Sequence, residues 1–130
     1  LPNHTDKIPN CYGRKVNNIG VWSEGYKSSL IFQSNDFDKF NYMSINVSKV
    51  LVEKGKTLLV NIYLNNKHLD TLNLKDIKNQ EIVINFNTKK FKQGINLIDF
   101  KIANPITPIS KLESVDGRLL GFLIKDIKFR

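Results

Sequence analysis

The sequence is poor in the residues that build metal centres and disulfide frameworks. Its 130 residues include one cysteine, Cys11, and two histidines, His4 and His68. A single cysteine excludes a disulfide within the chain and any zinc site of the Cys-x-x-Cys type. No apolar run approaches the roughly 18 to 20 residues that a membrane-spanning helix needs. These absences predict one soluble domain, long enough to bury a core without disulfides or a metal.

The motifs of common enzymes are missing as well. The chain has no G-x-S-x-G nucleophile elbow, no G-x-x-x-x-G-K-[S/T] phosphate loop and no G-x-G-x-x-G segment. Asp36 and Asp38 could serve as the carboxylates of a small hydrolase, but they also suit a turn beside Asn35, which we favour. We therefore expect no catalytic residues and no cofactor. A structural calcium ion on loop aspartates remains a minor alternative, without a supporting D-x-D-x-D-G spacing.

Positive charge is abundant but evenly spread. Lysine and arginine number 20 against 12 acidic residues, for a formal net charge of +8. The chain carries 17 lysines, 16 asparagines and 15 isoleucines, a bias that an AT-rich genome would produce. The only basic cluster is Lys89, Lys90 and Lys92, whereas nucleic-acid binders usually concentrate charge in arginine-rich stripes. We expect a lysine-rich solvated surface and no nucleic-acid partner.

Several short segments alternate apolar and polar residues, which is typical of β-strands with one buried face. The alternating apolar residues are Met43, Ile45 and Val47; Val60, Ile62 and Leu64; Ile82, Ile84 and Phe86; Ile98, Phe100 and Ile102; and Leu120, Phe122 and Ile124. One more strand is expected within residues 26–34. The alternation changes phase near Lys49, which predicts a bend or the end of a strand there, and again after Ile124, which predicts a bulge.

A tight hairpin is predicted around Asn65-Asn66. Both residues tolerate positive φ, and leucines at 69, 72 and 74 follow on the returning segment. Helix is limited to the short candidates 36–40 and 109–113. Seven or eight strands in this length predict an antiparallel, jelly-roll-like β-sandwich. We expect an irregular lead-in over 1–15 and a single domain over 16–130. Because the chain begins at Leu1, we expect it to be excised from a longer protein.

Two groups of residues suit contacts with sugar. Carbohydrate sites combine an aromatic ring that stacks on the sugar with amides and carboxylates that bind hydroxyl groups. Trp22 stands beside Glu24 and Tyr26, and Tyr63 stands near Asn61 on a strand. Trp22 could instead fill the sandwich interior, which we favour for this residue, and Tyr63 could be an isolated exposed ring.

Three short motifs carry a resemblance to a known family. They are Gly20-Val21-Trp22-Ser23-Glu24-Gly25, then Asn104-Pro105-Ile106-Thr107-Pro108 with Leu112, and finally Ser114-Val115-Asp116-Gly117-Arg118-Leu119-Leu120-Gly121. Over roughly residues 19–130 the chain resembles the β-sandwich, carbohydrate-binding-module-like domain at the C-terminal end of bacterial membrane enzymes of surface-glycan assembly. The resemblance is to phosphoglycerol transferases and some glycosyltransferases in particular.

The resemblance implies a non-catalytic accessory domain on the periplasmic or extracellular face of a membrane-anchored parent. Its partner would be a bacterial surface glycan or the parent's catalytic domain, with membrane contact only through the parent. From the residues themselves, Arg118 can pair with Asp116 and close the last loop by binding a carbonyl or carboxylate group. Structural roles are expected for the motif residues Asn104, Pro105, Pro108, Asp116, Arg118 and Gly121. The alternative is a purely structural domain that binds no sugar and exposes a broad apolar patch.

Overall fold

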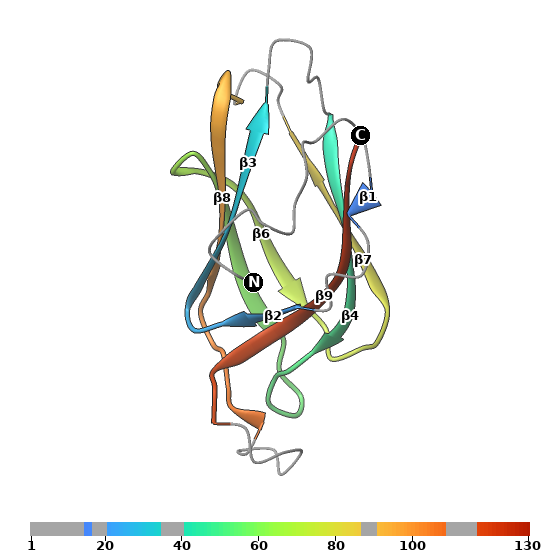
Figure 1. Cartoon of the computed structure of the whole chain (residues 1–130). Helices are drawn as coiled ribbons and strands as arrows, with labels where there is room; N and C mark the ends of the chain where they lie inside the picture. The colour runs from blue at the N-terminus through green and yellow to red at the C-terminus, as the bar shows by residue number, and fades with distance from the viewer. Residues whose placement is uncertain (1–14, 17–20, 35–40, 87–90, 109–116) are drawn as a thin grey trace.

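The computed structural model describes residues 15–16, 21–34, 41–86, 91–108 and 117–130. Most of the expected lead-in and both helix candidates lie outside these residues. Within the described part the chain forms nine strands (Figure 1). They are β1 (Lys15–Val16), β2 (Val21–Glu24), β3 (Lys27–Ser34), β4 (Tyr42–Val50), β5 (Leu58–Leu64), β6 (Lys67–Leu74), β7 (Gln80–Asn85), β8 (Gly94–Ile102) and β9 (Leu120–Phe129).

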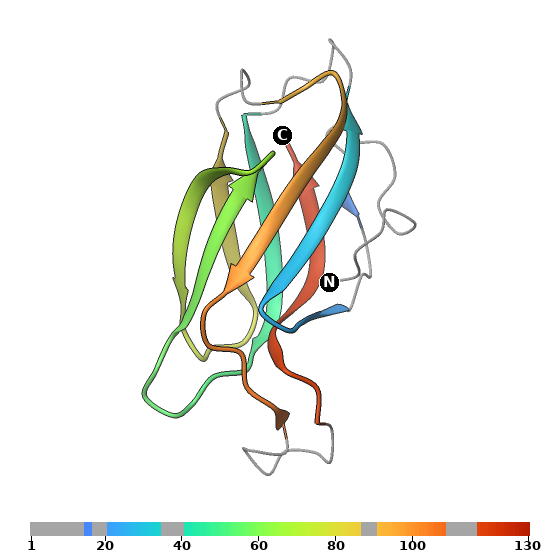
Figure 2. The ribbon, with the colours of Figure 1, turned by 90° about the vertical axis from the view of Figure 1, so that its left-hand side faces the viewer.

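The strands form two antiparallel sheets that pack face to face (Figure 1). The five-stranded sheet has the order β1-β9-β4-β7, with β2 also paired to β9, and the four-stranded sheet has the order β3-β8-β5-β6. Figure 2 looks onto the four-stranded sheet. The orders 2-9-4-7 and 3-8-5-6 are those of an eight-stranded jelly roll. The predicted fold is therefore confirmed, with the two-residue β1 added at one edge.

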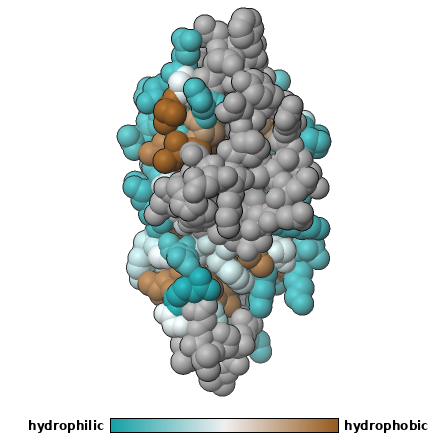
Figure 3. All heavy atoms as spheres, viewed as in Figure 1, coloured by the Kyte–Doolittle hydropathy of each residue, from teal (hydrophilic) through white to brown (hydrophobic). Residues whose placement is uncertain are grey.

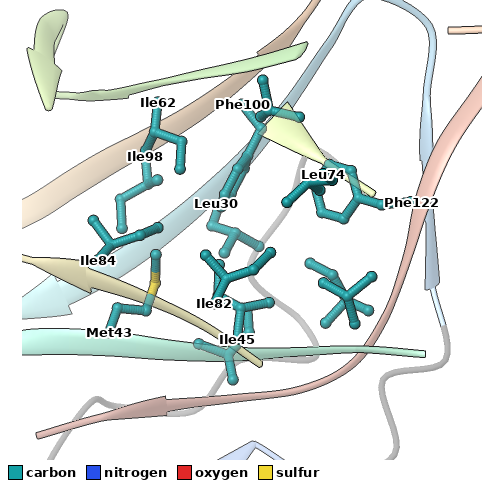
Figure 4. Packing of buried hydrophobic residues seen from close by; sticks show 14 of the residues in the cluster. Leu30, Met43, Ile45, Ile62, Leu74, Ile82, Ile84, Ile98, Phe100 and Phe122 are labelled. Carbon is teal, nitrogen blue, oxygen red and sulfur yellow. The ribbon is translucent and has the colours of Figure 1, made fainter. Parts of the chain in front are cut away.

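The core lies between the sheets and is built from the inward-facing side of each strand (Figure 4). Every apolar residue that the alternation assigned to the interior is buried. Phe100 of one sheet meets Phe122 of the other, with ring centroids 5.8 Å apart in an edge-to-face arrangement. Burial of each such large side chain stabilises the fold by about 1.5–3 kcal/mol before entropy is counted. This core fixes which side chains face outward.

The β5–β6 hairpin turns at Asn65-Asn66, as the sequence predicts. Their φ angles are 50° and 67°, in the left-handed region that asparagine tolerates. The turn is tied to β8, because the backbone N–H of Asn65 donates to the carbonyl of Leu97 at 2.8 Å. In return, the backbone N–H of Leu97 donates to Oδ1 of Asn65 at 2.9 Å. The hairpin therefore has a fixed position on the four-stranded sheet.

The two predicted changes of phase are confirmed. The register between β4 and β9 shifts between Asn46 and Val47 and again between Val47 and Lys49. On β9 the buried positions pass from Ile124 to Ile127, so both ends of this long strand keep an apolar side toward the core.

Candidate functional site

Polar and aromatic side chains gather on the outward face of the four-stranded sheet. On β5, Asn61 and Tyr63 alternate with buried residues, so they point away from the core. Strand register brings Asn61 opposite Lys101 of β8 and Thr71 of β6. It also brings Tyr63 opposite Asp99 and His68. We refer to these six residues, Asn61, Tyr63, His68, Thr71, Asp99 and Lys101, as the sheet-face cluster.

Three members of the sheet-face cluster form a hydrogen-bonded chain. The Thr71 hydroxyl donates to Oδ1 of Asn61 at 2.6 Å, and Nε2 of His68 lies 2.8 Å from the same hydroxyl oxygen. Because a hydroxyl has a single proton, which Thr71 gives to Asn61, Nε2 of His68 must be the donor. The Asn61 Nδ2 group makes no hydrogen bond to a described residue. It is a donor available to a ligand.

The Tyr63 ring is held from two sides. The His68 ring meets it edge-on, with centroids 5.4 Å apart and an interplanar angle of 78°. The Lys101 ammonium lies over the ring, with Nζ 4.3 Å from the centroid. A cation–π contact at an exposed site contributes about 0.5–1 kcal/mol. The ring is thus fixed in orientation, and the end of the exposed Lys101 side chain covers one side of it.

A carboxylate lies buried beside the Tyr63 ring. Asp99 is 2% exposed although it belongs to the outward side of β8, and the Ser29 hydroxyl of β3 donates to its Oδ1. No buried side-chain nitrogen or oxygen of the described residues lacks a hydrogen-bond partner. The oxygens of the Asp99 carboxylate therefore have their hydrogen-bond partners within the protein, next to the ring.

The second predicted sugar site, Trp22, Glu24 and Tyr26, is not brought together on one face of a sheet. Trp22 and Glu24 lie on β2 of the five-stranded sheet, and Tyr26 lies on the turn that leads to β3. Between Trp22 and Glu24, Ser23 is fully buried and its hydroxyl accepts the backbone N–H of Phe122 at 3.0 Å. The favoured interior position for Trp22 is wrong, because Ser23 takes the inward place and Trp22 is only half-buried. The Tyr26 side chain is 60% exposed.

Arg118 binds a carboxylate of a distant segment of the chain, that of Glu24. Its Nη1 pairs with Oε1 of Glu24 at 2.5 Å, and the two side chains are 55% and 54% exposed. The expected partner Asp116 lies outside the described residues. The ion pair connects the segment before β9 to β2, and it engages the carboxylate that we expected to bind sugar. Because both side chains are about half exposed, this ion pair is accessible to solvent.

The remaining motif residues hold the connection between β8 and β9. Asn104 accepts the backbone N–H of Leu59 and donates to the carbonyl of Thr57, each at 3.0 Å. Pro105 and Pro108 are buried. A Cβ atom at Gly121 would lie 2.9 Å from the Ser23 hydroxyl oxygen, so only glycine fits there without a shift. These contacts are structural in kind.

Several sequence hypotheses concern residues outside the described part, namely Asp36, Asp38, Lys89 and Lys90. Among the described residues, no group of three histidine, cysteine or acidic side chains could hold a metal ion. The same part of the chain contains no helix with the length and hydropathy to cross a membrane.

Sequence reasoning named Asn61 and Tyr63 but not their four partners in the sheet-face cluster. The alternation on β8 already assigned Asp99 and Lys101 to the outward side, since they alternate with the apolar Ile98, Phe100 and Ile102. What it could not supply was the strand order and register that bring β8 and β6 beside β5. His68 and Thr71 follow the tight turn, and a register shift beside Tyr63 sets their position.

Comparison with known proteins supports the fold. No protein-family model matches the chain, and no curated protein sequence matches it. Among solved structures, the chain is similar to a family 35 carbohydrate-binding module from an environmental isolate, with a TM-score of 0.51 and 11% sequence identity. The similarity covers 99% of this chain and 81% of that one. It supports a carbohydrate-binding-module-like β-sandwich at the level of the fold.

Proposed function

We propose that this domain binds carbohydrate on the outward face of its four-stranded sheet. The observation that carries the proposal is the Tyr63 ring, oriented by His68 and bordered by the hydrogen-bonded Asn61 and Thr71. A sugar stacks its C–H face on an aromatic ring while amide and hydroxyl groups bind its hydroxyls. To reach the ring, the sugar displaces the Lys101 ammonium, a contact of about 0.5–1 kcal/mol.

The fold adds support to this proposal. The similar solved structure is a carbohydrate-binding module, and the sheet-face cluster is carried by the rigid strands of the same kind of sandwich. At 11% identity the similarity does not transfer a binding site. The argument for the sheet face therefore rests on this chain's own side chains.

The group at Trp22, Glu24 and Tyr26 is the competing sugar site. It lies on the other sheet and on the turn between the sheets, whereas Asn61 and Tyr63 lie on β5, inside the four-stranded sheet. The Glu24 carboxylate is already engaged by Arg118. We therefore favour the sheet-face cluster, in which the Asn61 amide donor is available.

We propose as well that the domain is a non-catalytic accessory module of a membrane-anchored bacterial enzyme, a phosphoglycerol transferase or glycosyltransferase, on the periplasmic or extracellular face. This part rests on the motif resemblance around Trp22, Asn104 and Arg118. Its test is whether the full-length parent loses glycan modification when the sheet-face cluster is altered and its catalytic domain is intact.

A purely structural domain that packs on the parent is the second candidate. The observation in its favour is Ile95, 60% exposed, whose neighbours on the same face are the half-buried Ile31 and Leu97. Figure 3 shows apolar side chains gathered over β8 at the upper left. The other exposed large apolar side chains of the described residues, Tyr26, Ile77 and Val83, lie on separate segments. The apolar patch is therefore small, which favours the glycan proposal.

The test is a chemical-shift titration of the isotope-labelled domain with neutral and charged bacterial glycans. We expect shifts at Asn61, Tyr63 and Thr71, and their loss in Tyr63→Ala. The matched control is Tyr26→Ala, which removes a more exposed tyrosine and should leave binding intact. Shifts confined to Trp22 and Tyr26 would move the site to the turn. Absence of shifts with every glycan would favour the structural candidate.

A further inference from the structure

Lys27 and Lys101 stand directly opposite each other on the outward face of the four-stranded sheet. They are paired in the antiparallel register of β3 and β8, and both side chains are exposed. Like charges at directly opposed positions repel and destabilise a strand pair. Neither ammonium group forms an ion pair with a carboxylate of the described residues. No acidic side chain of this part of the chain neutralises the pair at contact distance.

The lysine pair is continuous with the sheet-face cluster. Lys101 is opposite Asn61 on its other side, and Asn61 is opposite Thr71. The row Lys27, Lys101, Asn61 and Thr71 thus takes one residue from each of the four strands, which lie side by side in Figure 2. At the usual strand spacing the row is about 14 Å long, enough for a sugar and a substituent beside it.

Lys101 belongs both to the lysine pair and to the surroundings of Tyr63, because its ammonium lies 4.3 Å from the centroid of the Tyr63 ring. A neutral sugar that stacks on Tyr63 removes the cation from the ring and offers it only uncharged hydroxyl oxygens in exchange. A sugar with an anionic substituent offers the displaced ammonium an ion pair. The Asp99 carboxylate beside the same ring opposes an anion over the ring itself, so the arrangement favours an anionic substituent that lies at the lysine pair while the sugar stacks on Tyr63.

The donors also bear on the kind of anion that the pair would bind. Arginine presents a planar fork that matches a carboxylate, whereas lysine donates as a single charged point. Two lysines approaching from neighbouring strands can each bind a different oxygen of one tetrahedral group. A phosphate monoester carries nearly two negative charges at neutral pH and so can balance both ammonium groups.

We propose that the domain selects glycans that carry a phosphate or sulfate ester, with the ester between Lys27 and Lys101 and the sugar on Tyr63. The inference rests on the proposed function of the sheet-face cluster. It assigns Lys27 and Lys101 as the residues that determine specificity. The shared chemistry is a tetrahedral oxyanion on a sugar, and separate phosphate and sulfate probes distinguish its two sources.

The experiment compares matched sugars by chemical-shift titration of the whole domain. Glucose, galactose and mannose are each offered unmodified, with a phosphate or sulfate ester at the primary hydroxyl, and as the uronate. We expect an esterified sugar to bind about fivefold or more tightly than its neutral form, a gain that falls with added salt. Lys27→Met and Lys101→Met should each remove most of this gain. Lys101→Met should also tighten binding of the neutral sugar, because the sugar no longer has to displace the ammonium group from the Tyr63 ring.

Lys125→Met is the control for net charge, since Lys125 is exposed on β9 of the other sheet. It should leave the preference for the ester unchanged. Equal affinity for neutral and esterified sugars at Tyr63 would overturn the inference and leave the proposed function standing. If inorganic phosphate binds as tightly as the sugar ester, the lysine pair binds the anion alone and does not select glycans, which would overturn the inference. Uronates that bind as tightly as the esters would overturn the assignment of a tetrahedral group.

Discussion

The hydroxyl of Ser23 occupies the space that a side chain at Gly121 would need. Ser23 is fully buried on β2, and its Oγ accepts the backbone N–H of Phe122 at 3.0 Å. A Cβ atom at Gly121 would lie 2.9 Å from that oxygen and 3.2 Å from methyl groups of Ile102 and Leu58. Close approach of β2 to β9 therefore depends on the absence of a side chain at Gly121.

Gly121→Ala should destabilise the domain by about 1–3 kcal/mol, because a methyl group forced into a packed interior displaces its neighbours. The measurement is the free energy of unfolding from urea denaturation. Gly117→Ala is the matched control, since a Cβ atom there meets nothing within 4 Å. If the two variants unfold at the same urea concentration, the close contact with Ser23 does not affect the free energy of unfolding.

Asn96 should be the most sensitive polar residue of the four-stranded sheet. It is fully buried, and its side chain binds both the N–H and the carbonyl of Lys92 at 2.8 Å and accepts from Asn65 Nδ2 at 2.9 Å. Asn96→Ala removes these hydrogen bonds from a buried position and should lower the unfolding free energy by about 2–3 kcal/mol. Asn85→Ala, at an exposed position of β7, should change it little. A small loss at Asn96 would mean that water replaces its bonds.

The elements of this fold could be predicted because alternation is a local property of the sequence. The run from Val60 to Leu64 buries every second residue, and the following asparagines turn the chain with positive φ. These features need no knowledge of the rest of the molecule. The jelly roll followed from the number and spacing of such runs.

Contacts between distant segments could not be predicted in the same way. Arg118 finds Glu24, 94 residues earlier in the chain, because β2 and β9 are neighbours. Lys101 covers Tyr63 because β8 lies beside β5 in a particular register. A shift of one residue would turn these side chains to the other face. The site therefore depends on pairing information that alternation alone does not contain.

The ion pair of Arg118 and Glu24 should contribute little to stability. Both side chains are about half exposed, and exposed pairs are usually coupled by no more than about 1 kcal/mol. A double-mutant cycle with Arg118→Ala and Glu24→Ala should give a coupling energy of about 0.5 kcal/mol, reduced by salt. A coupling above about 2 kcal/mol would show that the pair is shielded from solvent.

Trp22→Ala and Tyr63→Ala should separate stability from sugar binding. Trp22 is half-buried against β9, where it pairs with Leu123, so its removal should cost about 2 kcal/mol of unfolding free energy. It should leave glycan-induced shifts at Asn61 and Tyr63 unchanged. Tyr63→Ala should abolish those shifts, because the sugar loses its stacking surface. Both quantities can be followed on the same labelled samples, by urea denaturation and by titration. The opposite pattern, with binding lost in folded Trp22→Ala and kept in Tyr63→Ala, would assign the sugar to β2 and its turn.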